Sequence, residues 1–153
     1  MVITGVDVGI LGAIVSIKGD DIISIYDMPI TPKKRGKGYE TNAYLLADIL
    51  SDIGPDMVVV ESVTAMPGQG VTSMFGFGRG LGVIEGVIAG LGYKATFVQP
   101  RTWKKHFNLI GKDKDASRVE AIQRWPDRSD DFRLKKHVGR SDAALIAEWF
   151  YSD

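Results

Sequence analysis

Cysteine is absent from this chain of 153 residues, and histidine occurs only twice. The chain therefore has no disulfide framework, thiolate zinc site, iron–sulfur cluster or thiol nucleophile. Long apolar runs are also missing: the longest, residues 81–91, is interrupted by Glu85 and is shorter than the ~20 residues that cross a bilayer. No signal peptide is visible, so we expect a cytoplasmic protein.

Net charge is also lacking, because 19 basic residues balance 19 acidic ones. The balance conceals an asymmetry. Residues 1–62 carry five Lys or Arg and nine Asp or Glu, whereas residues 99–140 carry twelve and six. This division indicates that one part of the chain meets an anion and another holds a cation. The alternative is that the basic stretch is only a solvated helical face.

The length and the 44% hydrophobic content are typical of a single globular domain, which we place at residues 1–153. Apolar, β-branched segments predict five strands, the first three joined by tight turns into an antiparallel meander. The predicted strands are residues 2–8, 13–18, 22–28, 57–60 and 95–98.

Helical spacing of apolar residues predicts helices between and after the later strands. They are expected at residues 41–53, 72–91, 100–107, 116–125 and 141–150, with loops at 29–38 and 64–71. The predicted fold class is therefore α/β: a mixed five-stranded sheet, a meander followed by αβ units, with helices on both faces.

The long helix predicted at residues 72–91 contains a glycine every fourth residue, at Gly78, Gly82, Gly86 and Gly90. Each interior glycine costs roughly 0.5–1 kcal/mol relative to alanine. The stripe is therefore expected where another element or a second subunit packs closely on the helix backbone. The alternative is a loosely formed helix lying on the sheet.

Three acidic residues stand at the ends of predicted elements. Asp7 lies at the end of the first strand, Glu61 ends the apolar run 57–60, and Asp142 opens the last helix. Each could be structural alone, Asp142 by complementing the helix dipole. If the first and fourth strands are parallel neighbours, the carboxylates gather at one sheet edge and form an oxygen-rich site suited to Mg²⁺ or Mn²⁺. Two such ions ~4 Å apart can hydrolyse a phosphodiester.

An ordered series of motifs runs along almost the whole chain. It comprises Gly5-Val6-Asp7-Val8-Gly9, Val59-Val60-Glu61-Ser62, Ser73-Met74-Phe75-Gly76-Phe77-Gly78-Arg79-Gly80, Gln99-Pro100-Arg101-Thr102-Trp103-Lys104, Gly111-Lys112-Asp113-Lys114 and Gly139-Arg140-Ser141-Asp142-Ala143. In this series the chain resembles the RuvC-type Holliday junction resolvases of the RNase H-like superfamily, particularly their phage-like branch.

The resemblance implies a metal-dependent endonuclease, in a bacterial or phage-infected cell, that nicks a four-way DNA junction symmetrically as a homodimer. Asp7, Glu61 and Asp142 match the family's ligands for two Mg²⁺ ions, which Mn²⁺ can replace, and the long helix matches its dimer-forming helix. The residues expected to contact DNA are Arg79, Arg101, Lys104, Lys105, Lys112, Lys114 and Arg140.

The sequence departs from the family pattern at two places. A fourth acidic residue or a histidine is expected one helical turn before Asp142, but Gly139 and Val138 stand there. His137 is adjacent and is our candidate for the missing catalytic position, although a surface histidine is the alternative. Some members carry an aromatic wedge just after the glutamate, where this chain has Thr64 and Ala65. Phe75 and Phe77 are either stacking residues or, more in keeping with their position, core residues of the helix entry.

Other functions remain open at this stage. The chain could be an RNase H-like nuclease for flaps or RNA–DNA hybrids, or a protein that binds junctions and cuts them weakly or not at all. A fragment of an actin-like sugar kinase or ATPase shares the Asp-x-Gly start. However, the chain is too short for two such lobes and has no nucleotide-phosphate loop.

Overall fold

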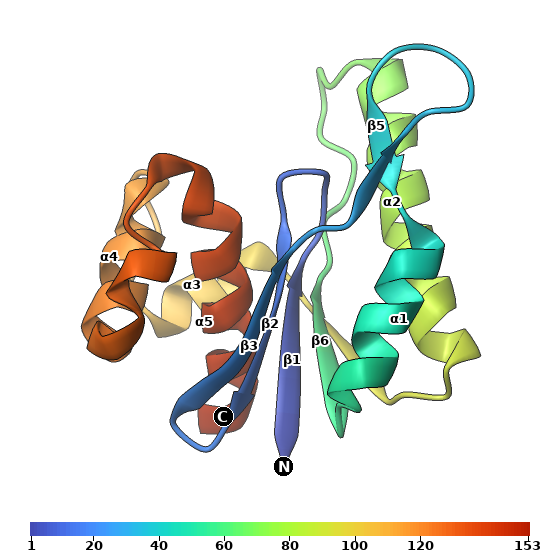
Figure 1. Cartoon of the computed structure of the whole chain (residues 1–153). Helices are drawn as coiled ribbons and strands as arrows, with labels where there is room; N and C mark the ends of the chain where they lie inside the picture. The colour runs from blue at the N-terminus through green and yellow to red at the C-terminus, as the bar shows by residue number, and fades with distance from the viewer.

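A mixed five-stranded sheet forms the centre of the computed structural model, which describes all 153 residues (Figure 1). Its strands stand in the order β3-β2-β1-β6-β7. The three antiparallel strands are joined to three parallel ones through β1, which belongs to both sets. Their bounds are β1 Val2–Asp7, β2 Ala13–Lys18, β3 Asp21–Asp27, β6 Met57–Glu61 and β7 Ala95–Val98. The predicted five-stranded mixed sheet is confirmed, and its first and fourth strands are parallel neighbours, the condition on which the gathering of Asp7 and Glu61 depends.

Helices cover both faces of this sheet (Figure 1). One apolar core lies between the sheet and α3, α4 and α5, and the other lies beneath α1 and α2. Alternating side chains of β6 serve the two cores: Val59 faces the first, and Val58 and Val60 face the second. The helices are α1 Ala43–Ile53, α2 Val71–Gly90, α3 Pro100–His106, α4 Asp115–Arg124, α5 Val138–Ser152 and the 3₁₀ turns η1 Pro126–Asp131 and η2 Lys135–His137.

The contact between β1 and α5 depends on Gly5. A Cβ atom at this position would meet the carbonyl oxygen of Ala143 and the backbone nitrogen of Ala147. Only a residue without a side chain lets the helix backbone come this close to the strand. The contact brings α5, which carries Asp142, directly onto the strand that carries Asp7.

The boundaries of α1 follow the expected signals. The Asn42 side chain caps the helix by accepting a hydrogen bond from the backbone nitrogen of Leu45 at 3.1 Å. Gly54 ends the helix in the left-handed conformation, with φ 60°. The helix predicted at residues 41–53 is therefore confirmed, with its first turn beginning at Ala43.

The long helix α2 buries only Ile84 and Ile88 completely. Cβ atoms built at Gly78, Gly82 and Gly86 would meet nothing within 4 Å, and the same holds at Gly90. The glycine stripe thus faces away from the rest of the chain, and the expectation that another element of the chain packs closely on it was wrong. None of the helices, α2 included, combines the length and apolar character required to cross a membrane.

Two predictions about local structure were wrong. The predicted loop 29–38 contains a strand, β4 (Ile30–Pro32), which pairs with β5 (Tyr39–Thr41) just beyond the loop in a second, two-stranded sheet. Strands of three residues are too short to show an alternating pattern. The last helix begins at Val138 rather than at residue 141. Gly139 suggested a boundary, but it lies inside the first turn.

Candidate active site

Asp7 and Glu61 are the last residues of neighbouring parallel strands. In the register of β1 and β6, Val6 lies opposite Val60, so the following residues reach the same edge of the sheet. Both side chains are partly buried there. The sheet therefore brings together two of the three predicted carboxylates, as expected.

Asp142 reaches this edge from α5, but not from the start of the helix. It is the fifth residue of α5, in the second turn, and the helix lies across β1. The interpretation that Asp142 complements the dipole of a first helical turn is therefore wrong. Its position is set by the close packing of α5 on Gly5.

The three carboxylates perturb one another. Burial, followed by the charges of Asp142 and Glu61, raises the pKa of Asp7 well above its usual range. Burial also raises the pKa of Asp142 to about 6, with a further contribution from Glu61. No three acidic or histidine side chains lie close enough to form a ready-made metal-binding group. The site thus gathers three carboxyl groups whose ionised forms are disfavoured by burial, without a closed ligand set.

Two residues that the sequence did not assign hold these carboxylates. The indole nitrogen of Trp103 donates a hydrogen bond of 2.7 Å to Glu61 Oε2, and the Trp103 side chain is completely buried. Burial raises the pKa of Glu61, and the Trp103 hydrogen bond opposes that rise. The Ser117 hydroxyl, which donates to the Lys114 carbonyl at 3.3 Å, also lowers the pKa of Asp142. Trp103 belongs to the motif at residues 99–104, but the spacing of that motif did not indicate a hydrogen bond to Glu61.

Trp103 is expected to act as a positioning residue for Glu61. Trp103→Phe removes only the N–H donor from a fully buried site, so Glu61 loses its fixed orientation and part of its ionisation. We expect hydrolytic activity to fall by about tenfold and its pH dependence to move to higher pH, because the Glu61 pKa rises. Trp125→Phe, which removes an indole hydrogen bond to the Asp20 carbonyl remote from the carboxylates, is the matched control. An unchanged pH profile in Trp103→Phe would refute the role.

A lysine-rich cleft opens beside the carboxylates. Its volume is about 640 Å³, and Asp7 and Asp142 both line it. The β1–β2 turn, from Gly9 to Gly12, forms one wall. Five lysines contribute to the lining: Lys104, Lys112, Lys114, Lys135 and Lys136. None of the five forms an ion pair within the chain, so their charge is available to an anion.

The structure separates the predicted DNA-contacting residues into two groups. Lys104, Lys112 and Lys114 line the cleft, whereas the other four do not. Arg140 forms a two-pronged ion pair with Asp27, at 2.7 and 2.9 Å, and Arg79 lies 3.6 Å from Glu40. Arg101 and Lys105 are exposed on α3. Lys135 and Lys136 were missed because a basic run resembles an ordinary solvated surface.

His137 does not line the cleft. Its ring is buried, and Nδ1 accepts a hydrogen bond of 3.3 Å from the backbone nitrogen of Leu134. Burial, then the charges of Arg140 and Lys136, lowers the pKa of His137. Its catalytic role stays a prediction, and the contacts give it a structural role in η2. Gly139 cannot bear a side chain there, because a Cβ would meet the Leu11 carbonyl and the Gly12 backbone.

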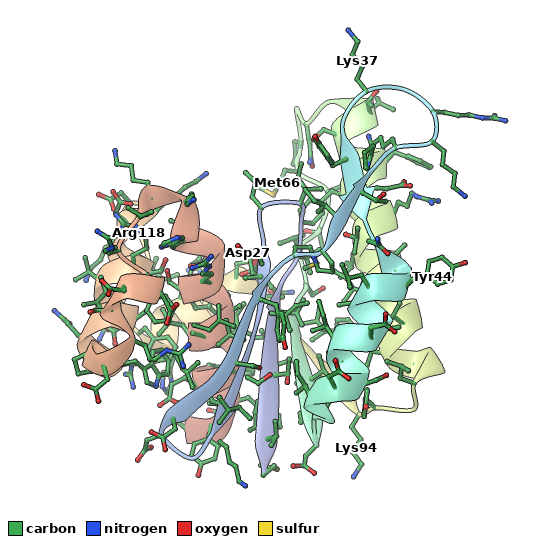
Figure 2. All side chains as sticks on the ribbon, viewed as in Figure 1. Asp27, Lys37, Tyr44, Met66, Lys94 and Arg118 are labelled. Atoms are coloured by element: carbon green, nitrogen blue, oxygen red, sulfur yellow. The ribbon has the colours of Figure 1, made fainter.

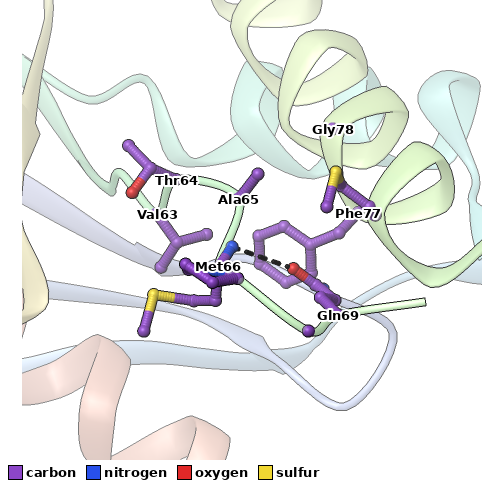
Figure 3. Close-up of a pocket in the computed structure, with 10 residues that line it drawn as sticks. Val63, Thr64, Ala65, Met66, Gln69, Phe77 and Gly78 are labelled. Atoms are coloured by element: carbon purple, nitrogen blue, oxygen red, sulfur yellow. Dashed lines mark hydrogen bonds between the residues drawn. The ribbon is translucent and has the colours of Figure 1, made fainter. Parts of the chain in front are cut away.

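A second cavity, of about 630 Å³, lies under the loop between β6 and α2 (Figure 3). Val63, Met66 and Phe77 line it, and the Met66 backbone nitrogen donates to Gln69 Oε1 at 3.4 Å. Phe77 also lines the lysine-rich cleft and so separates the two cavities. The expectation that Phe75 is a core residue was wrong: it is 73% exposed, whereas Phe77 packs against the core.

No family model matches the chain. A curated relative, the chloroplastic Holliday junction resolvase MOC1 of Chlamydomonas reinhardtii, is 37% identical over 95 residues, which are 59% of this chain. The match spans only 10% of that relative's length.

Solved structures of junction-resolving proteins share the fold over nearly the whole chain. RuvC of Thermus thermophilus matches with a TM-score of 0.65 and 13% identity, covering 99% of this chain and 96% of RuvC. Its complex with a Holliday junction substrate matches with a TM-score of 0.63 and 16% identity over 99% and 94% of the two chains. The yeast mitochondrial Holliday junction resolvase Ydc2 matches with a TM-score of 0.55 and 14% identity, covering 97% of this chain and 76% of Ydc2. The fold is therefore that of RuvC.

Proposed function

We propose that the chain is a divalent-metal-dependent endonuclease that resolves four-way DNA junctions. The observation that carries this proposal is the position of Asp7, Glu61 and Asp142 near one end of the sheet, where their charges interact, beside a cleft lined by unpaired lysines. This combination of a cation site and an anion-binding wall suits a phosphodiester substrate. The RuvC fold and the partial sequence match to a named junction resolvase favour the junction over other nucleic acids.

The donor set fits Mg²⁺ or Mn²⁺, because it consists of carboxylate oxygens and lacks sulfur. Burial and the neighbouring carboxylates raise the pKa values of Asp7 and Asp142, so a bound cation would favour their ionised forms. Asp7, Glu61 and Asp142 would hold the metal, with two ions per site. When bound, the ions supply activation of the attacking water and stabilisation of the leaving 3′ oxygen.

The chain's own residues prepare the site for that chemistry. The Lys104 charge lowers the pKa of all three carboxylates and so favours their ionised, ligand-competent forms. Trp103 orients Glu61, and the nearby Ser117 hydroxyl lowers the pKa of Asp142. The lysines of the cleft wall would hold the phosphates of the strand to be cut.

Cleavage of synthetic substrates tests the proposal. A four-way junction, a flap and an RNA–DNA hybrid are incubated with the protein in Mg²⁺, in Mn²⁺ and in EDTA. We expect paired nicks at symmetric positions in the junction, only with metal, and slower cutting of the other substrates. Preferential cutting of the flap or the hybrid would indicate an RNase H-like nuclease for those substrates. Binding of the junction without cutting in Mg²⁺ or Mn²⁺ would indicate a junction-binding protein.

Lys112 and Lys114 are expected to contribute directly to DNA affinity. Replacing both by Ala should reduce the slope of log K against log salt by about one for each lost phosphate contact, and weaken junction binding accordingly. Filter binding or fluorescence anisotropy at several salt concentrations measures both. The matched control is Lys18→Ala with Lys94→Ala, two exposed lysines outside the cleft. Equal effects of the two pairs would argue against the cleft as the DNA surface.

We also propose that two copies of the chain pair through α2. The support is the glycine stripe, which meets open space within the chain although it lowers helix stability. Two such helices can approach closely because their backbones are bare.

Replacing Gly82 and Gly86 by Leu should separate the copies, since the added side chains fill the space needed for close approach. Sedimentation equilibrium is expected to change from about twice 16.7 kDa to 16.7 kDa. Gln123→Leu, which adds an apolar side chain at an exposed position of α4, should leave the mass unchanged. A dimeric Gly82→Leu, Gly86→Leu variant would place the interface elsewhere.

A further inference from the structure

The two-stranded sheet β4–β5 and the turn that joins it carry a dense group of cations. Lys33, Lys34, Arg35 and Lys37 occupy four of five successive positions, and the last three are exposed. None of the four forms an ion pair, whereas six of the other seven arginines do. We call residues 30–41 the basic hairpin. Its tip is a concentration of positive charge that the chain itself leaves unneutralised.

Hydrogen bonds hold the basic hairpin in a defined shape. At its base the Asn42 nitrogen donates to the Pro29 carbonyl at 2.8 Å, and near the tip the Lys33 nitrogen donates to the Gly38 carbonyl at 3.0 Å. Gly36 and Gly38 turn the chain with φ of 82° and 98°. The cations are therefore presented by a structured turn.

Contacts with α2 fix the direction in which the basic hairpin projects. Glu40 pairs with Arg79 at 3.6 Å, and a Cβ at Gly80 would lie 3.9 Å from Thr41 Oγ1. The hairpin rises beside the start of α2, at the end of the molecule where β1 and β6 finish (Figure 1). Lys37 marks its tip, and Lys94 lies at the opposite end of the molecule (Figure 2).

The carboxylate edge of the sheet thus has unpaired cations on both sides. The lysines of the cleft wall come from α3, the α3–α4 loop and η2, on the face covered by α5. The basic hairpin stands on the other side, with α1 and α2. A nucleic acid crossing the carboxylates would meet phosphate-binding groups on each side.

We propose that the basic hairpin is a second DNA-binding surface, which holds backbone phosphates of a duplex arm beyond those in the lysine-rich cleft. The proposal rests on the proposed function, because it takes DNA as the anion. Charge complementarity selects a polyanion: the tip at residues 33–38 contains only cations and glycine, and the exposed apolar side chains of the hairpin, Ile30 and Tyr39, lie in its strands. The contacts would be to phosphates and would carry no sequence information.

The test compares two matched pairs of exposed lysines. Lys34→Gln with Lys37→Gln alters the basic hairpin, and Lys18→Gln with Lys94→Gln is the control outside it. Binding of a four-way junction made from synthetic oligonucleotides is measured in EDTA over a range of salt concentrations. We expect the hairpin pair to lower the slope of log K against log salt by about two and to weaken binding about tenfold or more at 0.1 M salt. The control pair should change neither quantity.

Acetylation of the wild-type protein gives a second measurement that does not depend on a variant. With junction bound in EDTA, Lys33, Lys34 and Lys37 should be protected from an amine-reactive reagent, while Lys18 and Lys94 stay reactive. Reactive hairpin lysines together with an unchanged salt slope would overturn the proposal. Loss of binding to anionic phospholipid vesicles in the hairpin pair, with DNA binding unchanged, would overturn it in favour of a membrane surface.

Failure of the hairpin proposal can be told apart from failure of the proposed function. The function is judged by metal-dependent nicking by the wild-type protein, and the hairpin is judged by binding without metal. A wild-type protein that binds junctions through the hairpin and never cuts would refute only the nuclease. A protein that cuts with the hairpin unprotected would refute only the hairpin.

Discussion

Asp7→Asn is expected to reduce the rate of junction cleavage by about 10³-fold or more while leaving junction affinity in EDTA close to that of the wild type. The substitution keeps the shape of a side chain in the middle of the carboxylate group but removes its charge. A loss of about 4 kcal/mol of transition-state stabilisation corresponds to this rate change and is typical of weakened metal catalysis. Single-turnover nicking with Mg²⁺ and anisotropy without metal measure the two quantities.

Removing a carboxylate is also expected to stabilise the metal-free protein at neutral pH. Burial raises the pKa values of Asp7 and Asp142 above those of the unfolded chain, so the folded state binds the protons more tightly. Their stabilising contribution is therefore present at low pH and is lost as the pH rises through the folded values, about 6 for Asp142. For Asp142 the loss amounts to at most about 3 kcal/mol.

Thermal unfolding in EDTA measures this effect. At pH 7.5 we expect Asp142→Asn to melt about 5–10 °C above the wild type, since 1 kcal/mol shifts the midpoint of a domain of this size by roughly 2–4 °C. The difference should disappear near pH 4. Mn²⁺ should raise the wild-type midpoint and leave that of Asp7→Asn almost unchanged.

Asp52→Asn is the matched control, because Asp52 is exposed on α1. It should alter neither the cleavage rate nor the melting temperature. If Asp7→Asn cleaves the junction at the wild-type rate, Asp7 is not a metal ligand. If Asp7→Asn neither cuts nor gains thermal stability, the role of Asp7 is to stabilise the fold, and it is not a metal ligand whose buried charge destabilises the metal-free protein.

The sequence predicted the sheet well because its strands obey simple rules. The run Met57–Glu61 is apolar at every position except the last, as a strand covered on both faces requires, and the residue that breaks the pattern is Glu61. This exception was informative, because a carboxylate at the end of a buried strand predicted both where the strand ends and where a metal site could form. Asp7 was found in the same way.

The residues that support the site were harder to predict, because they reach it through space. Trp103 lies 42 positions from Glu61, and its indole hydrogen bond depends on how α3 packs against the end of β6. The basic hairpin was assigned to a loop because its strands are only three residues long. Periodicity in the sequence indicates which face of a helix or strand a residue occupies. It predicts neither a hydrogen bond between distant elements nor a pair of three-residue strands.

Packing explains why no acidic residue stands at position 139. Gly139 stands one helical turn before Asp142, and the backbone of the β1–β2 turn occupies the space that its side chain would need. The turn also lines the cleft, through Gly9, Ile10 and Leu11. The position is therefore filled by backbone, and a three-carboxylate site is the arrangement that we propose.

Gly139→Asp is accordingly expected to damage the fold rather than complete the site. A Cβ at this position would meet the carbonyl of Leu11 and the backbone of Gly12, neither of which can rotate away as a side chain would. Overpacking against backbone, together with a buried charge, should cost about 3 kcal/mol or more. Thermal unfolding in EDTA should show a midpoint lower by about 6–12 °C, and cleavage should fall with it.

Val138→Asp separates the steric effect from the added charge. Val138 is half-buried, lines the cleft and also lies about one turn before Asp142, so a carboxylate there faces open volume. This variant should lose far less stability, and near pH 4, where an added carboxyl is largely protonated, its midpoint should approach that of the wild type. Gly139→Asp should stay destabilised at both pH values, because its clash does not titrate. A Gly139→Asp protein that melts like the wild type and cuts faster would show instead that the β1–β2 turn moves aside for a fourth ligand.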